Sequence, residues 1–99
     1  ATAASGSAPA YLYAFIEALA AAGAEAGLPG EDAARMARST ICGAASLLAQ
    51  SADGPDELRA RVTSPGGTTQ AALEVLLPGL APLLAAAVAA AAARSRELG

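Results

Sequence analysis

The sequence predicts an all-α domain, a bundle of about five helices. Apolar residues recur at helical spacing along most of the chain, and no stretch alternates with period two over a useful length. Clusters of proline and glycine divide these apolar stretches into separate elements. With 99 residues, the chain has the length of one domain, covering 1–99.

The first predicted helix runs from Pro9 to about Gly27. Proline suits the first turn of a helix, where its missing N–H would have no partner, and Ser7 precedes it as the expected cap. Gly27 can adopt the left-handed conformation that ends a helix, and Pro29 cannot continue one. The expected apolar stripe consists of Leu12, Phe15, Ile16 and Leu19.

The second predicted helix runs from about Glu31 to Ser51. Glu31 and Asp32 lie in its first turn, where negative charge interacts favourably with the helix dipole. Cys42 lies in an apolar helical context, which favours a small core residue over a reactive thiol. The expected buried stripe consists of Ala33, Met36, Ala37, Thr40, Ile41, Ala44, Leu47 and Leu48.

Three further helices are predicted in the second half. A short helix runs from Pro55 to about Val62, and another from about Thr68 to Leu77. The dipeptide Pro78-Gly79 is expected to separate the latter from a last helix. The expected inward residues are Leu58 and Val62, then Leu73, Leu76 and Leu77, then Leu80, Leu83, Leu84, Ala87, Val88 and Ala91.

Composition excludes several function classes. The formal net charge is -3 and the six basic residues, all arginines, do not form a patch, so no nucleic-acid partner is expected. One cysteine and no histidine rule out a structural zinc site, and no metal is expected. A Cys–His or Ser–His nucleophile pair is excluded within these residues for the same reason. A single unpaired cysteine suits a reducing compartment, so we expect a cytoplasmic protein.

No leader or membrane span is expected. The first residues lack the basic and apolar regions of a signal peptide. The alanine-rich run 80–93 is shorter than the ~20 residues that cross a bilayer, and Pro82 interrupts its start. Because the chain does not begin with methionine and starts like the interior of a protein, we expect it to be part of a longer one.

Composition also favours an obligate homodimer. The hydrophobic fraction is 55%, but alanine supplies much of it and aromatic residues make up only 3%. Buried alanine contributes little transfer free energy, so a monomer would have a thin core. Alanine faces let helices of a second chain approach closely, and the dimer interface would then be half of the core. The alternative is a compact monomeric bundle.

One stretch, VTSPGGTT, has residues suited to chemistry. We call residues 64–69 the glycine-rich loop; they are Ser64, Pro65, Gly66, Gly67, Thr68 and Thr69. The loop leads into a helix, whose first N–H groups lack internal partners, and its glycines leave the backbone accessible. It could bind a small carboxylate or phosphate. It lacks the lysine and the spacing of a phosphate-binding P-loop. From spacing alone, an ordinary turn capped by Thr68 is the favoured interpretation.

Five motifs together resemble the C-terminal domain of pyrroline-5-carboxylate reductase, over essentially the whole chain. They are SGSAPAY (5–11), GLP (27–29), CGAA (42–45), ELRARVTSPGGTT (57–69) and ARSRELG (93–99). The resemblance implies an all-α fold like the C-terminal domain of 6-phosphogluconate dehydrogenase, in an interleaved homodimer. It implies NADPH- or NADH-dependent reduction of 1-pyrroline-5-carboxylate, a small imino acid, to L-proline, the last step of proline biosynthesis. A higher oligomer of dimers is left open.

The resemblance also implies roles for individual residues. The glycine-rich loop would bind the substrate carboxylate, with Thr69 near the ring nitrogen as the catalytic residue. Ser7, Ala8 and Pro9 would lie near the nicotinamide. The Rossmann domain that precedes this domain in the family is absent from these residues, so the isolated chain should dimerise but be inactive. The alternative function is a stand-alone helical dimerisation or interaction module without a catalytic role.

Overall fold

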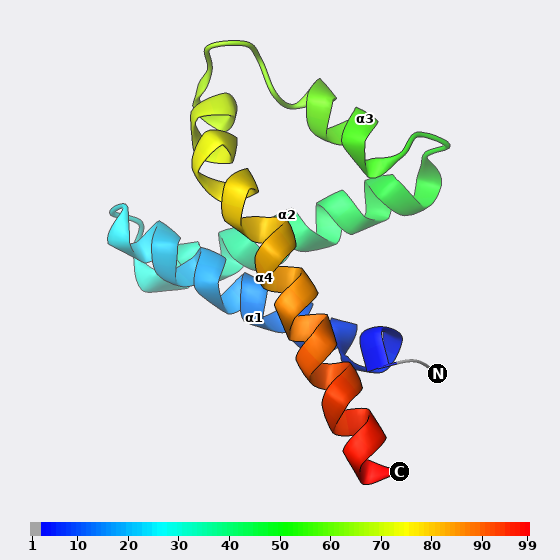
Figure 1. Cartoon of the computed structure of the whole chain (residues 1–99). Coiled ribbons are helices and arrows are strands. Elements are labelled where there is room, and N and C mark those ends of the chain that lie inside the picture. The colour runs from blue at the N-terminus through cyan, green and yellow to red at the C-terminus, as the bar shows by residue number, and fades with distance from the viewer. Residues whose placement is uncertain (1–2) are drawn as a thin grey trace. The chain divides into compact units, whose positions relative to one another are not determined.

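The computed structural model describes residues 3–99, with side chains described from residue 6 onward. It contains four helices: α1 (Ala3–Glu25), α2 (Gly30–Gln50), α3 (Pro55–Arg61) and α4 (Thr68–Leu98) (Figure 1). No strand occurs within these described residues. The predicted all-α class is therefore confirmed, with four helices in place of about five.

The chain forms two compact units. One unit is Ala8–Ala52, which holds most of α1 and all of α2. The other unit is Asp53–Gly99, which holds α3 and α4, together with the start of the chain up to Ser7. The glycine-rich loop lies wholly within this second unit.

In the first unit, α1 and α2 are joined by a turn that the sequence predicted correctly. Gly27 has φ +116° and ends α1, as expected for a glycine at this position. The Leu28 N–H donates to Gly23 O at 3.1 Å and the Gly27 N–H donates to Ala24 O at 3.1 Å. These two bonds form a Schellman motif, which satisfies carbonyl groups at the end of the helix.

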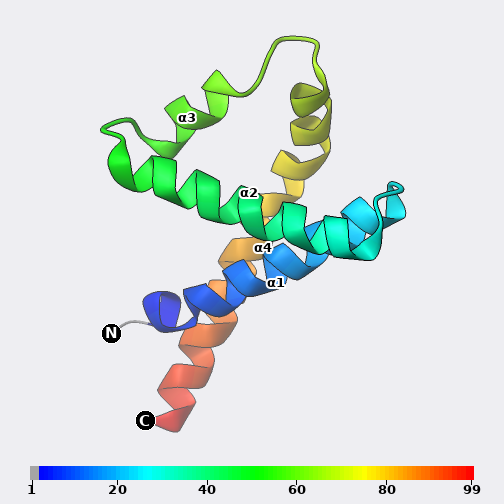
Figure 2. The same ribbon diagram turned by 180° about the vertical axis from the view of Figure 1, so that it is seen from behind.

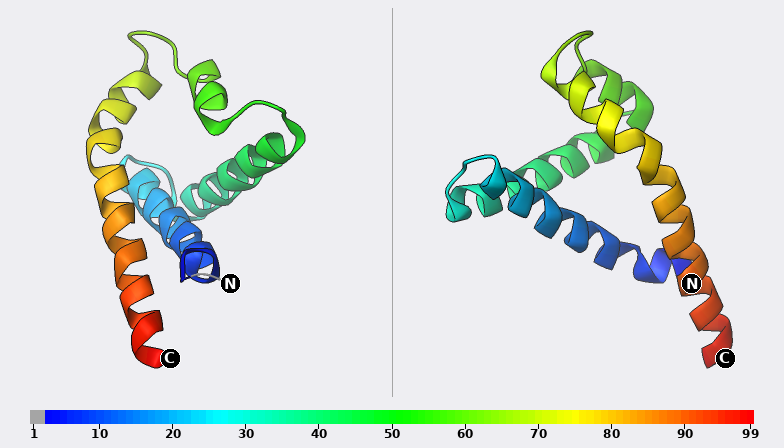
Figure 3. Two further views of the ribbon diagram at one scale, coloured as in Figure 1. Left: turned by 45° about the vertical axis from the view of Figure 1, so that its right-hand side comes forward. Right: turned by 60° about the vertical axis from the view of Figure 1, so that its left-hand side comes forward.

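The two helices diverge from this turn in a V (Figures 2 and 3). They pack closely near its apex, where a Cβ atom added to Gly23 would lie 3.5 Å from the Ala33 Cβ and 3.0 Å from the Met36 Cε. Ala33 and Ala37 are the two buried residues among the described side chains. Small residues therefore allow the close approach at the apex.

The predicted burial of α2 is correct near the apex and wrong beyond it. Met36 and Ile41 are half-buried, whereas Thr40, Ala44, Leu47 and Leu48 are exposed. Cys42 is likewise exposed, so its predicted place in the core is wrong for this chain alone. The physical reason is the divergence of the V, because α1 does not follow α2 to its far end (Figure 2).

Two prolines predicted to bound helices lie inside them. Helix α1 begins at Ala3, so Pro9 is internal and Ser7 is not its cap. Helix α4 continues through Pro78 and Pro82, so Pro78-Gly79 does not separate two helices. An internal proline removes one backbone hydrogen bond and bends the helix, which a long alanine- and leucine-rich segment tolerates. Figure 3 shows α4 bending between its yellow and orange parts.

Helix α4 is also apolar along most of its length. It has 31 residues, and an 18-residue window reaches a mean hydropathy of 2.1. By length and composition it could cross a membrane, and core helices of soluble proteins meet the same criterion. The two arguments against a span, shortness and interruption at Pro82, are therefore wrong. The expectation of no membrane span stays a prediction.

Apolar side chains on α4 and after α3 are less buried than predicted. Leu58, Leu73 and Leu80 are half-buried, whereas Val62 is 66% exposed because α3 ends at Arg61, one residue before it. On α4, Leu83 is 70% exposed, and Leu76, Leu77 and Leu84 are also exposed. The described residues of this chain thus leave a long leucine-bearing helix largely uncovered.

Candidate functional site

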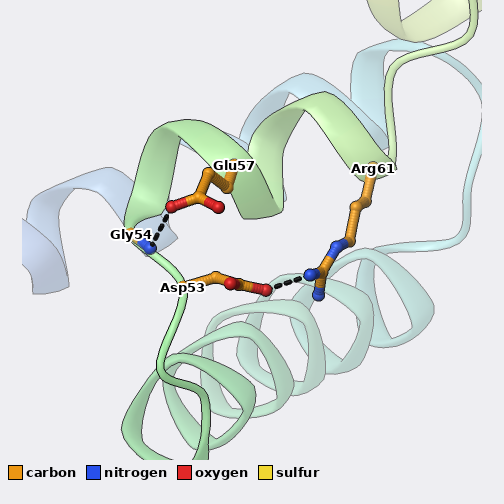
Figure 4. A network of polar contacts seen from close by, with 4 residues as sticks. All are labelled: Asp53, Gly54, Glu57 and Arg61. Carbon is orange, nitrogen blue, oxygen red and sulfur yellow. Dashed lines mark hydrogen bonds and ion pairs between the residues drawn. The ribbon is translucent and has the colours of Figure 1, made fainter.

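The glycine-rich loop is entered from α3, whose first turn is fixed by local contacts. Pro55 occupies the first helical position after Gly54, as predicted. The Glu57 Oε1 accepts a hydrogen bond from the Gly54 N–H at 3.2 Å (Figure 4). The Arg61 guanidinium forms an ion pair with the Asp53 carboxylate, which joins the last residue of α3 to the segment before it (Figure 4). One contact therefore lies at each end of α3, the short helix that precedes the loop in the sequence.

The first four residues of the loop form a tight turn. The Gly67 N–H donates to Ser64 O at 3.0 Å, Pro65 follows Ser64, and Gly66 has φ +77°. Proline at the second position and a left-handed glycine at the third are the features of a type II β-turn. Gly66 and Pro65 therefore have structural reasons for their identity, whatever the loop binds.

Gly67 is also constrained, although less strictly. A Cβ atom at this position would lie 3.2 Å from Ser64 O and 3.5 Å from the Ser64 Cβ. Because both neighbours belong to the turn itself, a Cβ atom at this position would require the turn to shift by a few tenths of an ångström. Gly67 is half-buried, while Ser64, Pro65, Gly66, Thr68 and Thr69 are exposed.

Helix α4 begins immediately after this turn. Gly67 is its N-cap residue, so the interpretation of Thr68 as the cap is wrong, and no side chain caps the helix from that position. The Ala71 N–H donates to Gly67 O at 3.2 Å. The N–H groups of Thr68, Thr69 and Gln70 precede the first intrahelical bonds and have no partner in the described part of the chain.

A side chain outside residues 64–69 also contacts the loop. Gln70, the third residue of α4, accepts a hydrogen bond at Oε1 from the Gly66 N–H. A glutamine three residues after an N-cap is a known capping signal, which could have identified it. With the Gly66 and Gly67 N–H groups both used internally, the N–H groups of Thr68, Thr69 and Gln70 remain for a ligand, and those of Thr68 and Thr69 belong to the loop itself.

The arrangement suits a small anion. Two adjacent N–H groups at the start of a long helix point positive partial charge outward. The hydroxyl groups of Ser64, Thr68 and Thr69 lie in the same short stretch and are exposed. A carboxylate has two oxygens that can each accept such a bond. The structure thus brings together the predicted substrate-binding residues 64–69.

The remaining predicted site residues lie elsewhere on the chain. Ser7, Ala8 and Pro9 are all within α1, at the point where the chain passes from one compact unit to the other. Ser7 is half-buried, and Ala8 and Pro9 are exposed. Among the described residues, no three His, Cys, Asp or Glu side chains are grouped so that they could hold a metal ion.

An open groove of about 840 Å³ adjoins the loop within the same unit. Its apolar lining comes from Ala60 of α3 and from Leu73, Leu77 and Pro78 of α4. Its polar lining comes from Asp56, Arg59, Thr63, Gln70 and Glu74. The groove follows the first half of α4, and Thr63 and Gln70, which flank the loop on either side, are part of its lining, whereas residues 64–69 are not.

Together, fold and loop define an all-α domain in which a tight turn leaves backbone N–H groups unpaired at the start of a long helix. Residues 1–98 match the family described as "Pyrroline-5-carboxylate reductase dimerisation". The chain therefore belongs to this family, which confirms the resemblance.

Individual proteins similar to this chain carry the same family name. A pyrroline-5-carboxylate reductase of Pisum sativum is 52% identical over 95 residues, which are 95% of this chain and 35% of that protein. One from Synechocystis is 46% identical over 99 residues, 99% of this chain and 37% of that protein. A crystal structure of Plasmodium falciparum pyrroline carboxylate reductase with NADP bound has a TM-score of 0.91 and 36% identity, covering 100% of this chain and 38% of that one. The chain thus spans about a third of the length of these relatives.

The left-handed glycine provides a first prediction. Replacing Gly66 by alanine should destabilise the folded protein by about 1 kcal/mol, because a Cβ atom is disfavoured at φ +77°. Thermal unfolding measures the effect. Gly30→Ala is the matched control, because Gly30 starts α2 without positive φ and an added Cβ would meet nothing within 4 Å. Equal melting temperatures for the two variants would contradict the turn geometry.

Proposed function

We propose that this chain is the C-terminal substrate-binding and dimerisation part of an NAD(P)H-dependent pyrroline-5-carboxylate reductase. The enzyme would reduce 1-pyrroline-5-carboxylate to L-proline, the last step of proline biosynthesis. The observation that carries the proposal is the turn at residues 64–67, which leaves the Thr68 and Thr69 N–H groups unpaired in a member of this family. The names of the relatives support the reaction and the NADP-bound relative supports the cofactor.

The loop would hold the substrate by its carboxylate. The Thr68 and Thr69 N–H groups would donate one bond to each carboxylate oxygen, and the Ser64 hydroxyl would add a third donor. Glycine at positions 66 and 67 leaves room for the ligand to reach the backbone. The hydroxyl group of Thr69, the second residue of α4, would orient the ring nitrogen of the substrate. An imine can arrive already protonated, so orientation suffices and no strong acid is required.

The residues of this chain do not by themselves fit a dinucleotide. The described part contains helices and the turns between them but no strand, and the sequence has no Gly-x-Gly-x-x-Gly motif. We infer that the hydride donor is held mainly by residues outside these 99, in a preceding Rossmann domain. Ser7, Ala8 and Pro9 would border the nicotinamide. The isolated chain should accordingly bind no dinucleotide and be inactive.

The partner would be a second copy of the same chain. Only Ala33 and Ala37 are buried among the described side chains, while leucines of α2 and α4 are exposed. A leucine side chain stabilises a protein substantially only when it is buried away from water. An interleaved homodimer would cover these faces, including the apolar length of α4, and we place the enzyme in the cytoplasm. Neither a nucleic acid nor a membrane is needed to cover them.

The test is NAD(P)H consumption by the complete protein that contains this chain, with 1-pyrroline-5-carboxylate as substrate. The matched control substrate is 1-pyrroline, which has the ring imine without the carboxylate. We expect reduction of the first, with kcat/KM for the second at least about 100-fold lower, because two charge-assisted hydrogen bonds are lost. A folded, dimeric protein without activity would support the alternative of a helical dimerisation module.

A further inference from the structure

The loop contains a contact that the proposed function does not use. The Gln70 side chain reaches back from the first turn of α4 and accepts the Gly66 N–H at Oε1. Gln70 is exposed and lines the groove beside the loop. The glutamine side chain thus connects the helix, the turn and the concave surface.

Packing does not hold the turn at Gly66. Gly66 is exposed, and a Cβ atom built on it would have no heavy atom within 4 Å. Besides the backbone preferences of Pro65 and Gly66, two hydrogen bonds act on this turn. One bond, from the Gly67 N–H to Ser64 O, closes the turn on itself. The bond to Gln70 joins the turn to α4, and so fixes how the turn meets the start of the helix.

We propose that Gln70 is a positioning residue for the carboxylate site. By holding the Gly66 N–H, it keeps the turn in the orientation that leaves the Thr68 and Thr69 N–H groups open to the substrate. It does not itself contact the substrate. The proposal rests on the proposed function of the loop, and it adds a residue whose identity determines how well that loop is organised before the substrate binds.

The opposite role for Gln70 would be competition. An oxygen that occupies the Gly66 N–H could block a donor that the substrate needs, and the substrate would then have to displace it. The two roles predict opposite changes in KM when the oxygen is removed. Positioning predicts that KM rises, because the loop must be ordered during binding. Competition predicts that KM falls.

The experiment compares Gln70→Met and Gln70→Glu with the wild type in the complete protein. Methionine keeps the length of the side chain and removes the acceptor, so we expect KM for pyrroline-5-carboxylate to rise about 3- to 10-fold with kcat within about 2-fold. Glutamate keeps an acceptor for the Gly66 N–H but adds negative charge near the carboxylate. Its KM should rise at low salt and return to near the wild-type value at about 1 M salt, where charges are screened.

Hydrogen exchange of the Gly66 N–H provides a readout that does not depend on catalysis. Protection should be lost in Gln70→Met and retained in Gln70→Glu. Lost protection with unchanged or lower KM would overturn the positioning role while leaving the proposed function intact. Unchanged protection in Gln70→Met would overturn the contact itself. An inactive wild-type protein that still shows this exchange pattern would contradict the proposed function and not the contact.

Discussion

If the complete protein is the proposed reductase, replacing Thr69 by alanine in it is expected to lower kcat for pyrroline-5-carboxylate reduction by about 10- to 100-fold. The reason is that Thr69 is the second residue of α4 and exposed, one position beyond the first unpaired N–H group. Its backbone N–H would remain available to the carboxylate in the variant, so binding should be largely preserved. The loss should therefore fall on kcat, through poorer orientation of the ring nitrogen. Steady-state kinetics with NAD(P)H measures it.

Two matched variants test whether the effect comes from the hydroxyl group of Thr69. Thr69→Ser keeps the hydroxyl group and should stay within about 3-fold of the wild type. Thr68→Ala removes the neighbouring hydroxyl, which is equally exposed, and should have a smaller effect than Thr69→Ala. Equal losses in Thr68→Ala and Thr69→Ala would show that the hydroxyl at position 69 has no special role. Circular dichroism confirms that each variant remains helical.

Replacing Leu83 by aspartate is expected to disrupt the dimer. Leu83 lies on α4 and is 70% exposed in the single chain. If a second copy covers this helix, an aspartate would be an unpaired charge inside an interface, and the dimer dissociation constant should rise by at least about 100-fold. Sedimentation equilibrium over a range of protein concentrations measures the change.

The control for this prediction lies on the same helix. Ser95→Asp places the same charge between Arg94 and Arg96, where α4 is exposed and polar. It should leave the dimer unchanged. If Leu83→Asp also left the association and stability unchanged, the exposed leucines of α4 would be an ordinary surface, and the monomeric alternative would be favoured.

Local rules predicted the turns well because the controlling residues are neighbours in the sequence. Gly27 ends α1 with the expected left-handed conformation, and Pro55 starts α3. The start of α4 at Thr68 follows from the turn that precedes it. In each case one backbone preference decides the outcome, and no distant part of the chain opposes it.

The same rules gave wrong helix boundaries where the residues on both sides of a proline favour a helix. Pro9 and Pro78 were interpreted as helix boundaries, yet both lie within helices. A proline excludes one hydrogen bond but does not exclude the helical conformation on either side. Burial was also misjudged, as at Leu47 and Leu83, because amphipathic spacing shows that a face is to be covered without showing which chain covers it.

The site was predictable in composition and less so in detail. Two glycines, a serine and two threonines around the start of a helix are compatible with an anion-binding turn, but spacing alone favoured an ordinary turn, and the carboxylate role came from the family resemblance. Which N–H groups are free could not be read from the sequence, because it depends on the bonds from Gly67 to Ser64 and from Gly66 to Gln70. The bond from Gly67 to Ser64 follows from the turn type, whereas the bond from Gly66 to Gln70 depends on the conformation of the Gln70 side chain.

The most direct test of the central claim is a crystal structure of the complete protein with L-proline bound. The product carries the same carboxylate as the substrate. We expect its carboxylate oxygens within hydrogen-bond distance of the Thr68 and Thr69 N–H groups, with the Gly66 N–H still bonded to Gln70. A proline carboxylate bound by side chains elsewhere, with the start of α4 empty, would contradict the assignment of this loop as the substrate site.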